Sequence, residues 1–473
     1  VNAADTLSNM PKAGENIVGY DTHKAIKKQF TFNELPPREL KGKSDLVKAY
    51  RLLYTRHSKP QLVRSRQVSS KLVGRDQEMI SLEFQVMKAL NGQGSVVNII
   101  GEEGIGKSRL IAELKRRDCM KHVTLFEGRA RSIGKNLSFH PINDILRQWA
   151  RIGEDDSEVE ALNNLISAVR KVYPEETDEI VPFIATMMSM KVAEVYAERL
   201  KGIEGESLET MIQISLRKLL IKASESTPLV IIVEDLHWAD KSSLDLLISL
   251  LPLAKTCKIV FINIYRFGHI ETGERIYSYS KETLSQHFVA IYLQALDAKM
   301  SEVQINNMVK ISKQYHPIID QIVKRAGGNP FFIEEVVRTF IDEKAIDVID
   351  GVFEATPKIY QMYVPNTIKD VLMARIDRLD EDTRSLLKVA SVIGRTFYHK
   401  ILVEVVNSNQ SVKLDLAKLK EVQLIRERRR MGEIEYIFKH AIAQEVIYES
   451  ILIQERRQLH LKVANAIERT FND

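Results

Sequence analysis

The sequence has little cysteine, no long apolar run and little excess charge. Its two cysteines, Cys119 and Cys257, lie far apart and form no metal-spaced cluster, which is typical of reduced core thiols in a cytoplasmic protein. No apolar run approaches the ~20 residues of a membrane-spanning helix, so we expect no membrane association. The net charge of +5, from 68 basic and 63 acidic side chains, does not favour wholesale nucleic-acid binding.

The start of the chain lacks two further features. It shows no basic-then-apolar signal pattern and no initiator methionine, and its opening "VNAAD" suggests a segment of a longer protein. What the chain does contain, 44% hydrophobic and 28% charged residues, is typical of a soluble, core-forming protein. The 473 residues suffice for about three domains at ~150 residues each.

The pattern along the chain predicts an α/β protein with five parts. Residues 1–53 resemble the end of an α/β unit, with two strands around a Pro-Pro and a Lys-Gly turn, and residues 54–70 form a basic, polar linker. Within 71–296, five short runs rich in Val and Ile alternate with helical patterns, which predicts a buried parallel sheet. From 297 the strands stop and amphipathic helices take over, which predicts a helical segment over 297–365. Helices and one β-hairpin over 366–473 favour a winged-helix domain.

The stretch "VVNIIGEEGIGKSRLIAEL" carries the most specific signal. Gly101, Gly106, Lys107 and Ser108 have the spacing of a phosphate-binding loop between a strand and a helix. The glycines, with Gly104 between them, let backbone N–H groups turn toward a β-phosphate, and the helix N-terminus adds positive potential. We expect the lysine to bridge the β- and γ-phosphates and the serine hydroxyl to ligate Mg²⁺. ATP or ADP is therefore the predicted ligand, with Mg²⁺ as its metal.

A second signal is the strand "PLVIIVED", which ends in Glu234 and Asp235. The carboxyl edge of a parallel sheet is where ligands bind, so we expect Glu234 to hold Mg²⁺ together with Ser108, and Asp235 to polarise the attacking water. The simpler alternative is that the two acids end a strand and cap the next helix. The short Asp235 side chain favours slow turnover. Of the residues that follow, we expect Trp238 to pack and Asp240 to cap the next helix, and we assign no catalytic role to His237.

Six stretches together resemble a known family: "LVGRDQEM", "GEEGIGKSRL", "IIVEDLHWAD", "GGNPFFIEEV", "IFKHAIAQEVIYESIL" and "RRQLHLKVANAIE". They are similar to signal-transduction ATPases with numerous domains, of the group fused behind class III adenylyl or guanylyl cyclase domains. The resemblance runs in order over nearly all of 71–473. It implies an AAA-type P-loop ATPase with a lid and a winged helix, which acts in cyclic nucleotide signalling beside an upstream cyclase domain, downstream helical repeats and protein partners.

The resemblance also implies three nucleotide contacts. Arg266 matches the family's γ-phosphate sensor, Pro330 a lid proline that packs on adenine, and His440 a winged-helix histidine that contacts the β-phosphate. Each has a simpler alternative: an exposed arginine at a strand end, a helix-starting proline after two glycines, and a satisfied core histidine. Gly74 and Arg75 match the segment where the chain enters the nucleotide site, through backbone contacts.

Residues 1–53 resemble the carboxyl-terminal end of a class III cyclase domain. Asn2 matches the family's transition-state asparagine, but Thr6 stands where its partner arginine is expected, and threonine provides no cationic fork for a phosphate. We therefore expect no cyclase activity from this chain.

Two other functions are weighed against a regulatory switch. A ring-forming motor needs an arginine finger, and the stretch 241–258 before the sensor strand contains no arginine. A transcription regulator would use the winged helix on DNA. Its support is "RERRR" at 426–430, which is more simply the solvated tip of a hairpin. The sequence thus favours a slowly hydrolysing ATPase switch over a DNA-binding or motor protein.

Overall fold

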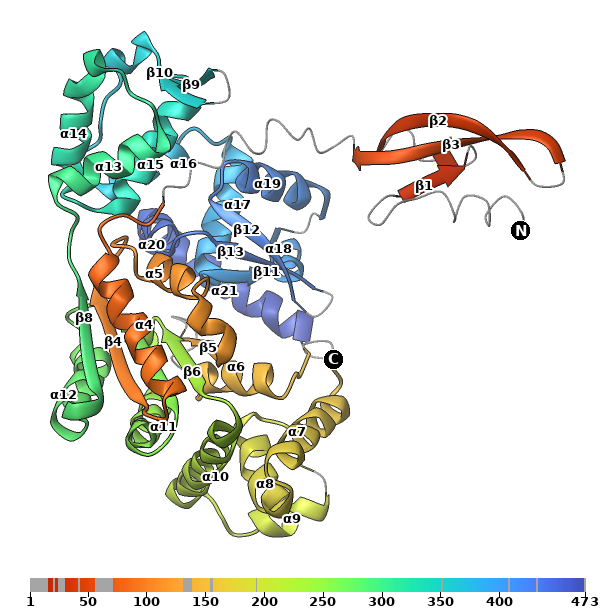
Figure 1. The fold of residues 1–473 in the computed structure, drawn as a ribbon, viewed down its shortest axis with the longest axis vertical. Helices are drawn as coiled ribbons and strands as arrows, with labels where there is room; N and C mark the ends of the chain where they lie inside the picture. The colour runs from red at the N-terminus through yellow and green to blue at the C-terminus, as the bar shows by residue number, and fades with distance from the viewer. Residues whose placement is uncertain are drawn as a thin grey trace. The chain divides into compact units, whose positions relative to one another are not determined.

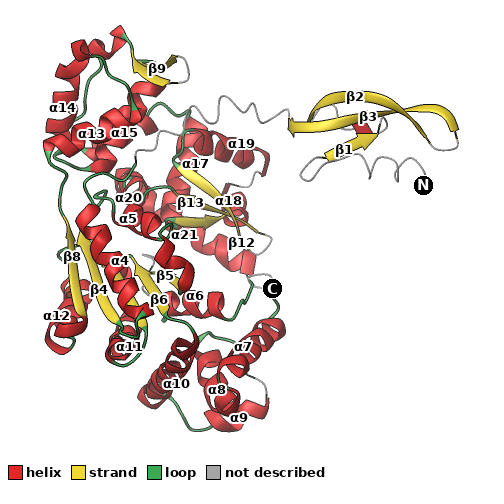
Figure 2. Cartoon of the chain, in the orientation of Figure 1, coloured by secondary structure: helices red, strands yellow, loops and turns green. Residues whose placement is uncertain are grey.

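The chain is described by a computed structural model and divides into two units. Contacts between Cα atoms group Val1–Ser69 with Val348–Glu354, and Ser70–Asp347 with Ala355–Asp473. Figure 2 distinguishes helix, strand and loop along the chain. The described residues are 16–19, 22–23, 30–40, 43–55, 71–130, 138–153, 156–192, 194–349, 352–406, 409–430 and 433–471.

The first unit contains a three-stranded antiparallel sheet. Its strands are β1 (Asn16–Gly19), β2 (Phe30–Leu40) and β3 (Lys43–Thr55), in the order β1-β3-β2. The expected Pro-Pro turn is wrong, because both prolines lie inside β2, where the pairing with β3 shifts register between Leu35 and Arg38. A register shift suits proline, which has no N–H for the ladder. Asn2, Thr6 and residues 56–70 of the expected linker lie outside the described residues.

The second unit is built on a five-stranded parallel sheet of the P-loop NTPase type, as the sequence predicted. The strand order is β5-β6-β7-β4-β8, and every neighbouring pair is parallel. β4 therefore lies inside the sheet, between the two strands that the chain reaches last. The strands are β4 (Ser95–Gly101), β5 (Thr124–Arg129), β6 (Leu229–Glu234), β7 (Ile259–Tyr265) and β8 (Phe288–Leu293).

Alternate residues of these strands face two separate cores. On one face, Val97 and Ile99 of β4 pack with α4 (Asp76–Leu90) and α5 (Lys107–Leu114), which Figure 1 shows side by side over the sheet. On the other face, Val96 and Ile100 join a larger core with the remaining helices of this part. These are α6 (His140–Trp149), α7 (Glu158–Val172), α8 (Thr177–Met187), α10 (Gly205–Ser226), α11 (Lys241–Leu250) and α12 (Arg275–Thr283), while the short α9 (Glu194–Leu200) packs on α8. Two-sided burial explains why the strands are apolar throughout.

Three helices follow the sheet and form the expected helical lid. They are α13 (Ala298–Met308), α14 (His316–Ala326) and α15 (Pro330–Asp342). The expectation that strands stop at 297 is wrong: β9 (Ile346–Ile349) and β10 (Val352–Ala355) pair in a two-stranded sheet. Both strands are only four residues long, which gives them little periodicity to recognise.

The carboxyl-terminal part combines helices with a small antiparallel sheet, as expected of a winged helix. The predicted hairpin is present, because β12 pairs with β13 from Ile425 opposite Phe438 to Arg430 opposite Glu433. An unexpected third strand, β11, pairs with the other edge of β13. The elements are α16 (Ile368–Ile376), α17 (Glu381–Ile393), β11 (Thr396–Tyr398), α18 (His399–Val406), α19 (Asn409–Glu421), β12 (Ile425–Arg430), β13 (Glu433–Phe438), α20 (Ala441–Ser450) and α21 (Ile453–Phe471).

A glycine fixes how closely α6 approaches the sheet. A Cβ atom on Gly128 of β5 would overlap the carbonyl oxygen of Pro141 and come within 3.1 Å of Ile145 Cδ1. Overpacking of this kind typically costs about 1–3 kcal/mol. We therefore expect Gly128→Ala to lower the denaturation midpoint of the protein. Gly92→Ala is the comparison, because it meets no atom within 4 Å and bears only the strain of its φ of 92°. Equal midpoints for Gly128→Ala and wild type would show that α6 can move away from β5.

Candidate nucleotide-binding site

The P-loop lies at the carboxyl end of β4 and leads directly into α5. Gly101 ends the strand, and Lys107 is the first residue of the helix. Gly106 precedes the helix with a φ of 104°, and Gly104 has a φ of 76°. Both values fall in the region that favours glycine. The backbone therefore turns in the manner of a phosphate cradle in front of a helix N-terminus.

The Lys107 side chain folds back over this loop. Its ammonium group donates to the carbonyl oxygens of Gly101 (2.7 Å) and Glu102 (2.8 Å). Burial, together with the positive charge of Arg266, lowers the pKa of this ammonium to about 8, although Asp235 and Glu103 act in the opposite direction. The lysine is thus a partly desolvated cation in the cradle, where negative phosphate would compensate its charge.

The first turn of α15 packs directly on the P-loop. Asn329 Nδ2 donates to the carbonyl oxygen of Glu103 (2.9 Å), and the Phe331 backbone N–H donates to that of Gly104 (3.3 Å). A Cβ on Gly104 would meet Asn329 Oδ1 at 2.8 Å, so the glycine also permits this close approach. Pro330, the predicted adenine contact, lies between the two lid residues that touch the loop. The simpler alternative, in which Pro330 only starts a helix, also fits, because Pro330 is the first residue of α15.

Arg266, the predicted γ-phosphate sensor, joins the P-loop to the winged-helix part. It follows β7, and its Nη2 donates to Glu103 Oε1 (2.9 Å) and to Glu445 Oε1 of α20 (3.0 Å). Burial and the neighbouring Glu445 raise the pKa of Glu103 to about 7, against the opposing effect of Arg266. The arginine is therefore not an exposed strand-end side chain but the bridge between two carboxyl groups from different domains.

Glu234 and Asp235 are both held by arginines. Arg129, at the end of the neighbouring strand β5, forms a close ion pair with Glu234, and its Nε lies 3.4 Å from Asp235 Oδ2. Arg395, in the loop between α17 and β11, donates from Nη1 to the same Asp235 oxygen (2.6 Å). Although burial opposes it, the positive charge of these two arginines holds the pKa of Asp235 below its usual value.

The two carboxylates differ in what they face. Asp235 has a left-handed backbone (φ 58°) and acts electrostatically on Lys107, whereas Glu234 forms its ion pair with Arg129 of β5. This placement favours Asp235, rather than Glu234, as the carboxylate on the nucleotide side. The expected roles, Glu234 as metal ligand and Asp235 as the group that polarises water, remain predictions.

His440 lies directly before α20 and packs against the lid. Its ring centroid is 4.2 Å from that of Phe331, with the two rings tilted by 39°, and the Phe331 backbone bonds to the P-loop. Among the described residues, the buried His440 Nε2 has no hydrogen-bond partner. Burial lowers the pKa of the ring to about 3, helped by the positive charges of Lys439 and Arg338 and opposed by Glu335. A neutral imidazole with one unused nitrogen is thus held at the junction of lid and winged helix.

His237 is buried beside the acidic strand end. Its side chain is 3% exposed, and neither ring nitrogen has a hydrogen-bond partner in the part of the chain that the structure describes. The ring lies near those of Trp238 and His269, with centroids 5.3 and 5.0 Å away. Asp240, three residues after His237, caps α11 by accepting from the Ser243 backbone N–H (2.8 Å). The expected packing and capping roles of this segment agree with these contacts.

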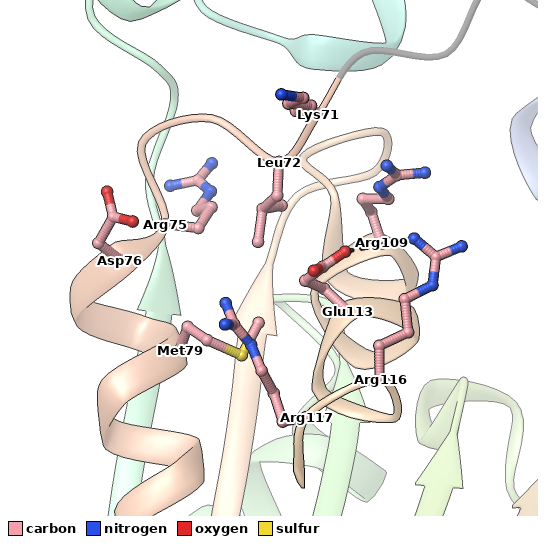
Figure 3. Close-up of a pocket in the computed structure, with 9 residues that line it drawn as sticks. All are labelled: Lys71, Leu72, Arg75, Asp76, Met79, Arg109, Glu113, Arg116 and Arg117. Atoms are coloured by element: carbon pink, nitrogen blue, oxygen red, sulfur yellow. Dashed lines mark ion pairs between the residues drawn. The ribbon is translucent and has the colours of Figure 1, made fainter.

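A cavity of about 380 Å³ opens between α4 and α5. Figure 3 shows Leu72 pointing between the two helices. Arg75 anchors this region to the P-loop, because its Nη2 donates to the carbonyl oxygens of Gln294 (2.6 Å) and Ile105 (3.3 Å). Arg75 thus contributes its side chain, and not only the expected backbone. The lining residues are Lys71, Leu72, Arg75, Asp76, Met79, Arg109, Glu113, Arg116 and Arg117, and carboxylates pair with Arg75, Arg116 and Arg117.

Sequence reasoning missed Arg129, Arg395 and Glu445. Arg129 had a usable signal, since it ends the strand that a parallel sheet places beside the acidic strand. Arg395 and Glu445 had no such signal in the sequence, because only the packing of the winged-helix part brings them to the site.

Comparison with known proteins places an ATPase domain over the sheet. Residues 71–262 match the family model "AAA ATPase domain", and residues 312–354 match "Domain of unknown function (DUF8739)". An uncharacterized protein of Rhizobium meliloti (strain 1021) is 24% identical over 95% of this chain, which spans 42% of that protein's length. The chain thus contains an AAA-type P-loop ATPase domain, and nucleotide binding agrees with this match.

Two solved structures match this chain at low similarity. One is a signal-transduction ATPase with numerous domains from Pyrococcus horikoshii, which carries a tetratricopeptide repeat sensor. It has a TM-score of 0.47 and 14% identity, over 86% of this chain and 47% of its own. The other is the ORC2 protein of Aeropyrum pernix in ADPNP and ADP complexes, with a TM-score of 0.37 and 13% identity, over 87% of this chain and 98% of its own.

Replacement of Lys107, the positively charged side chain of the P-loop, tests the nucleotide-binding site. We expect Lys107→Ala to weaken binding of a fluorescent ATP analogue beyond detection, because charge-assisted contacts to phosphate are each worth about 1.5–3 kcal/mol. Lys115→Ala is the matched control: Lys115 follows the same helix but pairs with Glu127. Wild-type affinity in Lys107→Ala would refute the P-loop assignment.

The buried His237 predicts sensitivity to acid. Burial lowers the pKa of its ring to about 3, although Asp235 opposes the shift, whereas a histidine in the unfolded chain titrates near 6.5. The unfolded state therefore binds the proton first, and stability present above about pH 6.5 is lost as the pH falls toward 3. We expect His237→Leu to lose less thermal stability than wild type between pH 7 and 5, and exposed His122→Leu to behave as wild type. Equal losses in all three proteins would contradict this.

Proposed function

We propose that the chain is a regulatory switch that binds ATP or ADP and hydrolyses ATP slowly. The observation that carries the proposal is that three parts of the second unit meet at one phosphate loop. Asn329 and Phe331 of the lid bond to its carbonyl groups, and Glu445 of the winged-helix part reaches it through Arg266. A nucleotide bound in this loop would lie close to all three parts. Its phosphates can therefore control how the three parts contact one another.

In the closed arrangement, ADP would be held by groups that the chain already places together. Lys107 and the N-terminus of α5 would bind the phosphates, Pro330 would pack on the base, and the unused Nε2 of His440 would reach a phosphate oxygen. A γ-phosphate would add negative charge close to Glu103 and would compete with it for Arg266. ATP would therefore favour release of the winged-helix part, because a ligand shifts such an equilibrium only by its different affinity for the two states.

We expect slow turnover because Glu234 and Asp235 are both paired with arginines. A carboxylate that accepts hydrogen bonds from guanidinium groups is a poor base for water, and both Glu234 and Asp235 have such partners. The stretch 241–258 contains no arginine to serve as a finger for a neighbour. The proposed role is therefore that of a switch with occasional resetting by hydrolysis, not a motor.

The donor chemistry suits Mg²⁺, but the arrangement does not. The Ser108 hydroxyl and the two carboxylates are oxygen ligands of the kind Mg²⁺ prefers. Arginines pair with both carboxylates, however, and occupy oxygens that a cation would need. We therefore assign no step of the closed arrangement to the metal.

We further propose that this module belongs to a cytoplasmic cyclase-ATPase fusion protein, which works in cyclic nucleotide signalling with protein partners. The support is the resemblance of its motifs and of residues 1–53. In the described part of the chain, no helix is both long and apolar enough to span a bilayer. Support for DNA binding is weaker, because Lys420 pairs with Glu427 inside the basic run.

Release of ADP tests the switch. His440→Ala removes one hydrogen bond to a charged phosphate, worth about 1.5–3 kcal/mol, or roughly ten- to a hundredfold in population. We expect ADP to leave this variant faster by about that factor in stopped-flow experiments, with the basal ATPase rate raised.

The matched control is His460→Ala, an exposed histidine of α21 that contacts Tyr448 (3.0 Å). We expect it to release ADP at the wild-type rate. If His440→Ala also released ADP at the wild-type rate, His440 would be a core histidine, and the winged-helix part would make no contact with the nucleotide through it.

A further inference from the structure

The strand-end carboxylates already have cationic partners. Arg395 donates to Asp235 at 2.6 Å, Arg129 approaches the same oxygen at 3.4 Å, and Arg129 also forms a close ion pair with Glu234. The Asp235 and Arg395 side chains are 19% and 22% exposed. The pair is therefore mostly shielded from water, where ion pairs are screened less than on an open surface.

Arg395 belongs to the winged-helix part and moves with it. It follows Gly394, which ends α17 with a φ of 134°. Its own carbonyl oxygen accepts from the Phe438 backbone N–H of β13 (2.8 Å). The backbone of Arg395 is thus tied to the small sheet of the winged-helix part, while its side chain reaches the end of β6. The contact with Asp235 exists only when the two domains are closed.

The guanidinium and a divalent cation would need the same oxygen. Asp235 Oδ2 accepts the hydrogen bond from Arg395, and a carboxylate oxygen is also what a divalent cation requires at this edge of the sheet. Two positive groups at one carboxylate repel each other at short range. Closure of the winged helix and occupancy by the cation therefore oppose one another.

We propose that Arg395 and a divalent cation compete for Asp235, so that the closed arrangement holds nucleotide without metal and metal binding requires release of the winged-helix part. This proposal rests on the switch function above and identifies Arg395 as the positioning residue that couples metal to domain arrangement. Because such coupling is reciprocal, the metal weakens closure by the same factor by which closure weakens metal binding.

The test is a titration of the ADP-loaded full chain with Mn²⁺, in which electron paramagnetic resonance counts the free ion. We expect wild type to bind Mn²⁺ weakly and Arg395→Gln to bind it at least about tenfold more tightly, which corresponds to ~1.4 kcal/mol. Arg395→Lys keeps a cation and should lie between them. Adding Asp235→Asn to Arg395→Gln should abolish the gain. Arg457→Gln, an exposed arginine of α21, is the matched control and should bind Mn²⁺ as wild type does.

The outcomes separate this inference from the switch itself. Equal Mn²⁺ affinity in wild type and in the Arg395→Gln and Arg395→Lys variants, with ADP retained in all, would overturn the competition and leave the switch intact. Tighter Mn²⁺ binding that survived Asp235→Asn would overturn it as well, because the gained ligand would lie elsewhere. Failure of wild type to retain ADP would instead count against the proposed function. Melting curves identify any variant that does not fold, and Arg395→Lys then decides the question.

Discussion

The closed arrangement of the second unit depends on how charge is compensated at the carboxyl edge of the parallel sheet. Arg266 bridges Glu103 and Glu445, and Arg395 holds Asp235. In both contacts one partner comes from the ATPase domain and the other from the winged-helix part. Buried or half-buried charges are costly unless paired, so neither domain can leave the other without exposing these groups to water or to another ion. A nucleotide, whose phosphates lie among the same groups, is the natural competitor.

Packing reinforces these charges at the lid. Phe331 lies in the hydrophobic core of the winged-helix part, packs its ring against that of His440 and bonds through its backbone to Gly104. One residue of the lid thus touches both neighbours. A change at the P-loop, such as the addition of a phosphate, would act on the start of α15 and through its aromatic ring on the domain beyond. This gives the proposed switch a contiguous path made of packed side chains.

Much of this could be predicted from sequence because the signals are local. Five Val- and Ile-rich runs became the five parallel strands, since burial on both faces demands apolar residues at every position. The spacing of the P-loop residues, and the strand and helix on either side of them, could likewise be recognised in the sequence. The misplaced Pro-Pro turn and the missed strands β9, β10 and β11 show the limit, since short strands and register shifts have no clear period.

The arginine partners could not be predicted, because they are set by contacts between domains. Arg395 lies 160 residues from Asp235, and Glu445 lies 179 from Arg266, so no motif joins them. For the same reason, the sequence identified Glu234 and Asp235 but not their ion pairs. As carboxylates at the end of a strand, they suggest an active metal site. Only the structure shows the guanidinium groups that neutralise their charge.

Hydrogen–deuterium exchange of α15 and α20 tests the central claim most directly. It would compare the protein with ADP and with a non-hydrolysable ATP analogue. If nucleotide state controls closure, the backbone amides of Pro330–Asp342 and Ala441–Ser450 are protected with ADP and exchange faster with the analogue, because their contacts to the P-loop and Arg266 are released. Equal protection of both helices in the two states, with both nucleotides bound, would contradict the switch.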